Sequence, residues 1–154
     1  MAYYQFRREQ FLPGSLEEIW AFIFNPGNLK RITPDSMGFD ITSEGLPDTM
    51  YEGMMIAYRV APLLRIPTTW VTEITHVKKH HYFVDEQRVG PYKMWHHEHF
   101  LEATGDGVKM TDIVSYQPPF AFLGRIANQL IIRRKLEQIF DHRAEVLKTL
   151  FGGS

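Results

Sequence analysis

The stretch PPFAFLGRIANQLIIRRKLEQIFDHRAEVLKTL, residues 118–150, repeats its apolar side chains every three or four positions. This is the spacing of one face of an α-helix. The stripe consists of Phe122, Ile126, Leu130, Arg133, Leu136, Ile139, Phe140, Arg143 and Leu147, widened by Ile131, Ile132 and Val146. It predicts an amphipathic helix of about seven or eight turns, entered at Pro118–Pro119 and ended at Gly152–Gly153. A helix this long needs an apolar surface of matching length.

The chain before this helix offers such a surface, because most of residues 52–117 read as strands. The expected strands are 2–12, 38–42, 52–60, 68–76, 81–87, 93–102 and 109–117. Two short helices are expected after the first strand, one capped by Ser15 with Glu18 three residues later and one over residues 28–33. The prediction is an α+β fold, in which a curved antiparallel sheet of about seven strands wraps around the C-terminal helix. We expect residues 1–151 to form a single domain and 152–154 a loose tail.

Turn positions predict which side chains share a face of the sheet. A two-residue turn at Gly105–Asp106 places Leu101 opposite Met110, His99 opposite Asp112, His97 opposite Val114, and Trp95 opposite Tyr116. A hairpin centred on Gly90–Pro91 places Gln87 near Trp95, Asp85 near His97, and Phe83 near His99. The preceding strand adds Trp70, Thr72, Ile74 and His76 to the same side. We expect this face to point towards the long helix.

The polar members of this face, Asp85, His97, His99 and Asp112, need partners if they are buried. The expected pairs are Asp85 with His97 and His99 with Asp112. Such pairs are structural in many sheets, and in an aromatic pocket they also suit a small-molecule site. The four residues are likewise the candidate catalytic groups, because histidine titrates near neutral pH. Two histidines beside two carboxylates also allow a mononuclear metal site, but strand spacing of two is common without metal. We therefore expect no metal and no cofactor.

Composition excludes several classes of protein. The formal net charge of −1 argues against a nucleic-acid surface, and no apolar run reaches the length of a membrane span. The chain contains no cysteine, which excludes disulfides and thiol nucleophiles. Residues 1–10 do not resemble a signal peptide, so a cytoplasmic location is expected. Eleven Phe, seven Tyr, three Trp and seven Met suit either an ordinary core or an adaptable apolar pocket.

The order of elements resembles the START-like helix-grip superfamily, also called SRPBCC. Within it, the chain resembles a bacterial ligand-binding subgroup. The motifs that carry this resemblance are Gly90-Pro91-Tyr92 with Trp95, His97 and His99, residues 110–116 (MTDIVSY), residues 118–124 (PPFAFLG), and Ile139-Phe140 with Arg143. The resemblance implies a deep cavity between sheet and helix that binds a hydrophobic or amphipathic molecule. It does not imply a reaction, because the superfamily includes carriers, sensors and enzymes, polyketide cyclases among them.

Three functions remain open from the sequence. The first is non-catalytic binding of a lipid, polyketide or isoprenoid-like molecule by a monomer or homodimer. The ligand-binding residues expected for it are Tyr58, Trp70, Thr72, Ile74, Phe83, Asp85, Gln87, Trp95, His97, His99, Met110, Asp112, Tyr116, Phe122, Ile126 and Leu130. The second is an enzyme of cyclase, dehydratase or hydrolase type that uses a His/Asp pair in the same cavity. The third is an interaction module whose helix packs flush against the sheet.

Overall fold

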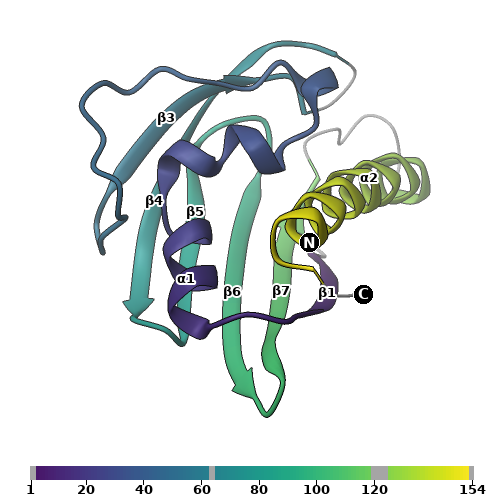
Figure 1. Cartoon of the computed structure of the whole chain (residues 1–154). Coiled ribbons are helices and arrows are strands. Elements are labelled where there is room, and N and C mark those ends of the chain that lie inside the picture. The colour runs from purple at the N-terminus through teal and green to yellow at the C-terminus, as the bar shows by residue number, and fades with distance from the viewer. Residues whose placement is uncertain (1–2, 63–64, 119–124, 153–154) are drawn as a thin grey trace.

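A seven-stranded antiparallel sheet forms the body of the computed structural model, which describes residues 3–62, 65–118 and 125–152. The strand order is β1-β7-β6-β5-β4-β3-β2. The strands are β1 (Tyr4–Leu12), β2 (Asp40–Ile41), β3 (Met55–Val60), β4 (Thr68–Lys78), β5 (Tyr82–Val89), β6 (Met94–Thr104) and β7 (Gly107–Gln117). The predicted α+β class and the curved sheet with a long C-terminal helix are confirmed (Figure 1).

The helices lie on one side of this sheet (Figure 1). The α1 helix (Leu16–Ile23) begins at the predicted cap, where Ser15 Oγ accepts a hydrogen bond from the backbone N–H of Glu18 at 3.1 Å. The second expected helix, over residues 28–33, is instead a series of 3₁₀ turns: η1 (Pro26–Asn28), η2 (Lys30–Ile32) and η3 (Asp35–Met37). Asn25 and Thr33, the residues before Pro26 and Pro34, are both extended, as residues before proline usually are, so only a short segment remains between them for helical turns. No helix in the described ranges is long and apolar enough to cross a membrane.

The long helix α2 (Arg125–Phe151) packs against β1 and η2. Two polar contacts tie it to β1: an ion pair between Arg8 and Asp141 at 2.8 Å, and a hydrogen bond from Gln10 to the carbonyl of Ala144 at 2.9 Å. Residues 119–124, including part of the predicted helix and Phe122, lie outside the described residues, as do residues 153–154 of the predicted tail. Gly152 ends the helix with a positive φ of 81°, the left-handed conformation that glycine adopts readily.

The buried stripe of α2 differs from the predicted one in its first turns. Its fully or nearly buried members are Ile132, Leu136, Phe140, Arg143 and Leu147, whereas Ile126 and Leu130 are 77% and 64% exposed. At 3.6 residues per turn, Leu130 lies about 120° around the helix from Leu136. The predicted stripe was therefore too broad: Ile126 and Leu130 are exposed, and Arg133 lies at its edge with its guanidinium 5.1 Å from the centre of the buried Phe6 ring.

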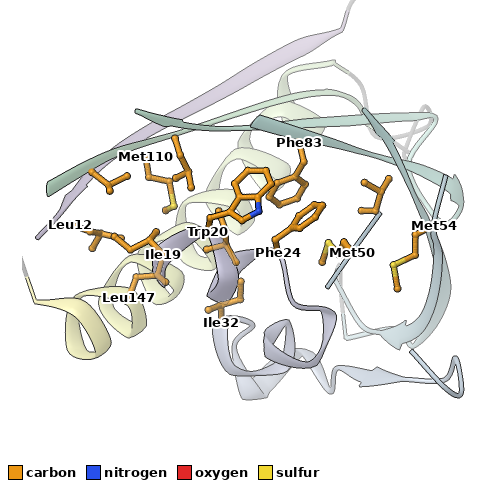
Figure 2. Packing of buried hydrophobic residues seen from close by; sticks show 14 of the residues in the cluster. Leu12, Ile19, Trp20, Phe24, Ile32, Met50, Met54, Phe83, Met110 and Leu147 are labelled. Carbon is orange, nitrogen blue, oxygen red and sulfur yellow. The ribbon is translucent and has the colours of Figure 1, made fainter. Parts of the chain in front are cut away.

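Two apolar clusters fill the space between the sheet and the helices. One joins α1 and the end of α2 to the sheet, and Figure 2 shows Trp20 and Phe24 against Phe83 of β5. The ring centroids of Phe24 and Phe83 are 5.1 Å apart. The second cluster joins the middle of α2 to the other half of the sheet, with Phe140 packed on Phe6 at 5.1 Å. Both clusters lie on the face that was predicted to point towards the helix.

The strand registers agree with the turn analysis for β6 and β7. Thr104 pairs with Gly107 across the Gly105–Asp106 turn, and His99 pairs with Asp112. One face assignment was wrong: the register shifts between Ile74 and His76, so His76 points to solvent and Val77 packs against the core instead. A β-bulge of this kind inserts one residue and reverses the alternation beyond it.

Gln87 and Gly90 together build the β5–β6 connection. The Gln87 side chain donates to the carbonyl of Tyr92 at 2.7 Å and accepts from its N–H at 3.0 Å. A Cβ on Gly90 would lie only 2.4 Å from Gln87 Oε1. The absence of a side chain at Gly90 is therefore what allows Gln87 to close this turn.

We expect Gly90→Ala to lower the free energy of unfolding by about 1–3 kcal/mol, because the new methyl displaces Gln87 and leaves the backbone of Tyr92 unpaired. Gly105→Ala is the matched control, since no atom lies within 4 Å of its Cβ position. Urea unfolding of both variants measures the difference. In the Gln87→Ala background the cost of Gly90→Ala should largely disappear, and an undiminished cost there would contradict the explanation.

Candidate functional site

Three adjacent strands bring the polar cluster together on the concave face. Asp85 of β5 pairs with His97 of β6, and His99 of β6 pairs with Asp112 of β7. Side chains two residues apart on a strand share a face, so His97 and His99 lie next to each other. Their rings stack with centroids 3.6 Å apart and planes inclined by 28°. The sequence therefore predicted correctly which four residues meet.

The hydrogen bonds in this cluster run diagonally. His97 Nε2 bonds to Asp112 Oδ1 at 2.9 Å, and His99 Nε2 bonds to Asp85 Oδ2 at 2.5 Å. The directly opposite partners predicted from the register are farther apart: His97 Nδ1 lies 3.7 Å from Asp85 Oδ2, and His99 Nδ1 lies 3.3 Å from Asp112 Oδ1. Each histidine thus lies between both carboxylates. Side chains lean along a strand, which brings diagonal neighbours within reach.

Arg143 of α2 adds a cation to this cluster. Its Nη1 lies 3.4 Å from Asp112 Oδ1, and the side chain is almost completely buried. The sequence predicted Arg143 in the buried stripe of the helix but not among the site residues. The available signal was a permanently charged residue at a core position of an amphipathic helix, which requires a buried counter-charge.

For each of the two carboxylates, burial raises the pKa and neighbouring positive charges lower it. Burial alone raises the pKa of Asp112, but the charge of Arg143 and the histidine bonds outweigh it and hold that pKa well below its usual value. Burial likewise raises the pKa of Asp85, and the His99 hydrogen bond and nearby positive charges reverse the shift and lower it. Both carboxylates are therefore ionised at neutral pH.

The pKa values of the two histidines are shifted in opposite directions. Burial and the neighbouring charge of His99 lower the pKa of His97 to about 4, despite its bond to Asp112. Burial also disfavours the charged form of His99, but contacts with both Asp112 and Asp85 raise its pKa above the ordinary value. The stacked pair thus consists of a neutral His97 and a His99 that favours the imidazolium form. Like-charge repulsion between adjacent rings explains why the pair carries one excess proton, held mainly by His99.

A pocket of about 170 Å³ adjoins the cluster, between the sheet, the 3₁₀ turns and the middle of α2. Nine predicted ligand-binding residues line it: Tyr58, Trp70, Thr72, Ile74, Phe83, Asp85, Trp95, His97 and His99. The wall also includes residues that the sequence analysis did not select: Ile23, Leu29, Ile32, Thr33, Met37, Phe39, Met50, Ile56, Val60, Pro62, Tyr92, Ile139, Phe140 and Arg143. Most of these come from the 3₁₀ turns, the strands at the β2 edge and α2. Periodicity alone does not show which part of the sheet these segments cover.

The other predicted ligand-binding residues lie elsewhere in the structure. Gln87 closes the β5–β6 turn, Met110 belongs to the apolar core, and Asp112 lies behind the histidines. The hydroxyl of Tyr116 donates to Gln129 of α2 at 3.2 Å. Ile126 and Leu130 are exposed, and Phe122 lies outside the described residues. A ligand role for these residues stays a prediction.

Asp85, His97 and His99 also form a possible metal-binding group, with one ligand atom from each within 4.8 Å of the others. Two histidines and one carboxylate suit a divalent transition metal. In this arrangement, Nε2 of each histidine is hydrogen-bonded to a carboxylate, His97 to Asp112 and His99 to Asp85. A metal bound at either of these nitrogens would replace the hydrogen bond that the nitrogen now makes, because a ligand nitrogen must be deprotonated. The donor set therefore fits a metal chemically, and the same atoms form the hydrogen-bonded cluster.

Comparison with solved structures identifies the architecture. Protein CV1439 from Chromobacterium violaceum matches with a TM-score of 0.70 at 11% identity, over 97% of this chain and 99% of that one. Ara h 8.0201 matches with a TM-score of 0.62 at 12% identity, over 96% and 99%. The fold is the helix-grip fold. The di-domain ARO/CYC StfQ of the steffimycin biosynthetic pathway matches with a TM-score of 0.72 at 10% identity, over 97% of this chain and 51% of StfQ.

The solved structures share the helix-grip fold with this chain although their sequences are very different from it. No protein-family model matches the chain, and no curated protein sequence does. Identities of 10–12% show a shared fold alone. A shared fold does not specify a function, which depends on the pocket and its polar cluster.

Proposed function

We propose that this helix-grip protein binds a hydrophobic or amphipathic small molecule, such as a lipid, polyketide or isoprenoid-like compound, in the pocket between sheet and α2. The observation that carries the proposal is a mostly apolar and aromatic wall that includes one compact group of polar and charged side chains, namely Asp85, His97, His99 and Arg143. Apolar area supplies affinity in such sites, and a few polar groups orient the ligand.

Two further features support a binding role. Among the described residues, the buried side-chain nitrogens without a hydrogen-bond partner are His99 Nδ1 and Arg143 Nε, both in this cluster. Incompletely satisfied buried polar groups are uncommon in structural cores and occur at functional sites. The neighbour StfQ is described as an ARO/CYC from a biosynthetic pathway, which is consistent with small-molecule chemistry on this fold.

The size of the pocket limits its occupant. Drug-sized ligands occupy pockets of roughly 300–1,000 Å³, and the volume here is about 170 Å³. A compact ring system, or one end of a longer chain, fits this space without rearrangement.

We expect Ile139→Trp to weaken ligand binding at least about tenfold, because Ile139 lines the pocket and an indole would fill much of its volume. Ile126→Trp is the matched control, with the same substitution on the exposed face of the same helix. The measurement is mass spectrometry of compounds released from the purified protein, followed by titration of the released compound into each variant. Equal binding by the two variants would place the site elsewhere. No released compound, together with no thermal shift across a lipid panel, would count against binding altogether.

An enzymatic role is the second candidate, favoured by the neutral His97 at the pocket wall. A neutral imidazole whose Nε2 is held by an ionised carboxylate is suited to act as a general base. The same experiment separates the two functions. A compound recovered unchanged after incubation supports a carrier or sensor, whereas recovery of a converted compound, with conversion lost in His97→Gln, supports the enzyme.

A further inference from the structure

One carboxylate of the cluster faces the pocket and the other does not. The side chain of Asp85 is 15% exposed and forms part of the pocket wall, whereas that of Asp112 is 2% exposed and lies behind the histidines. A ligand in the pocket therefore meets Asp85 first.

Asp85 has hydrogen-bonding capacity left for a ligand. Within the described part of the chain, Asp85 accepts one hydrogen bond, from His99 Nε2 to its Oδ2 atom. An ionised carboxylate has about four acceptor positions on its two oxygens. The nearby polar groups of the wall are paired with one another, since Thr72 Oγ1 lies 3.1 Å from Trp70 Nε1 and 3.2 Å from the Tyr58 hydroxyl. The two unpartnered nitrogens of the cluster, His99 Nδ1 and Arg143 Nε, expose almost no surface, so the hydrogen-bonding capacity that a ligand reaches here is the acceptor capacity of Asp85.

The charges of the cluster already balance. Asp85 and Asp112 are negative, Arg143 is positive, and His99 has a carboxylate near both ring nitrogens, which favours its charged form. His97, stacked on His99 at 3.6 Å, is neutral. A ligand anion would add an uncompensated negative charge next to Asp85 in a buried site, which is strongly unfavourable. A neutral ligand leaves the balance undisturbed.

The apolar part of the wall favours flat rings. Tyr58 and Trp70 stack with planes 12° apart, and Trp95 stands against Trp70 at 89° with centroids 5.3 Å apart. Aromatic faces and edges in this arrangement make favourable contacts with another planar ring. The compact volume of the pocket suits the same shape.

We propose that the pocket selects an uncharged, planar hydrophobic molecule carrying a hydroxyl group, which donates a hydrogen bond to Asp85, and that it rejects the corresponding carboxylates. This inference rests on the proposed binding function and specifies the ligand class of the same site. Asp85 is the specificity-determining residue, the aromatic wall supplies affinity, and the hydrogen bond from His99 and the charge of Arg143 favour the ionised form of Asp85.

Three probes with the same ring system test this selectivity at neutral pH: 2-naphthol, 2-methoxynaphthalene and 2-naphthoate. They present a hydroxyl donor, no donor, and an anion, respectively. Calorimetric titration of the intact protein should show 2-naphthol binding at least about tenfold more tightly than 2-methoxynaphthalene, because a hydrogen bond to a charged group is lost. We expect 2-naphthoate to bind more weakly than both.

The Asp85→Asn variant assigns this selectivity to one residue. Its preference for 2-naphthol over 2-methoxynaphthalene should shrink to less than about threefold, and its discrimination against 2-naphthoate should fall. Retained binding of 2-methoxynaphthalene shows that the variant is folded, and the ranking in the unmodified protein tests the inference even if the variant is unstable. Binding of 2-naphthoate as tightly as 2-naphthol, or no preference for the hydroxyl, would overturn the inference and leave the proposed binding function intact. Binding of none of the three would overturn the inference, and the search for released compounds would then decide the proposed function separately.

Discussion

Asp112→Asn is expected to lower the free energy of unfolding by about 3–5 kcal/mol. Asp112 contacts His97, His99 and Arg143 at 2.9, 3.3 and 3.4 Å, and it is almost fully buried. An amide keeps the shape of the side chain but removes the charge, so the Arg143 cation loses its nearest buried counter-charge. Removing one partner of a buried ion pair costs more than the pair contributes, because the remaining charge is left without water or a partner.

Asp141→Asn is the control for this prediction. Asp141 also pairs with an arginine, at 2.8 Å, but its side chain is 68% exposed. Exposed ion pairs contribute about 0–1 kcal/mol, so urea unfolding should show little change. A second measurement uses Arg143→Met in the Asp112→Asn background, which removes the stranded cation and should recover part of the loss. Equal costs for Asp112→Asn and Asp141→Asn would show that the cluster does not depend on charge.

The second large effect is a stability maximum near pH 6.5, the ordinary pKa of histidine. The folded pKa of His97 is lowered to about 4, so between pH 6.5 and about 4 the unfolded chain binds more protons. Stability therefore falls as the pH is lowered through this window, by roughly 3 kcal/mol at 1.36 kcal/mol per pH unit. The pKa of His99 is raised, so its contribution is complete below pH 6.5 and is lost as the pH rises through its folded pKa. Below the ordinary pKa of 3.8, the lowered pKa values of Asp85 and Asp112 steepen the acid side further.

Urea unfolding at a series of pH values tests this profile. His97→Gln should flatten the profile between about pH 4 and 6.5, and His99→Gln should flatten the side above pH 6.5. The exposed His76 provides the control, because His76→Gln changes no group of the buried cluster. A profile that stays level between pH 4 and 6.5 would show that His97 is not held neutral in the folded protein.

The sequence predicted the structure correctly where local chemistry determines the geometry, as at helix caps and tight turns. Ser15 marks the start of α1, because a serine hydroxyl can accept a hydrogen bond from a backbone N–H in the first turn of a helix. Gly105–Asp106 determines the pairing of β6 with β7, and this pairing places His99 opposite Asp112. The predictions failed where local irregularities interrupt a regular element: residues 28–33 form 3₁₀ turns between two prolines, and a bulge before His76 reverses the strand face.

Helical periodicity, strand alternation and turn positions, all local properties of the chain, were enough to predict a curved antiparallel sheet around the C-terminal helix and the meeting of Asp85, His97, His99 and Asp112. Only the tertiary structure decided that the hydrogen bonds run diagonally, that Arg143 joins the cluster from α2, and that the 3₁₀ turns close the pocket. The reason is physical: helical periodicity constrains which residues share a face, but the rotation of α2 is set by packing against β1 and η2. That rotation turns Arg143 towards Asp112 and leaves Ile126 and Leu130 exposed.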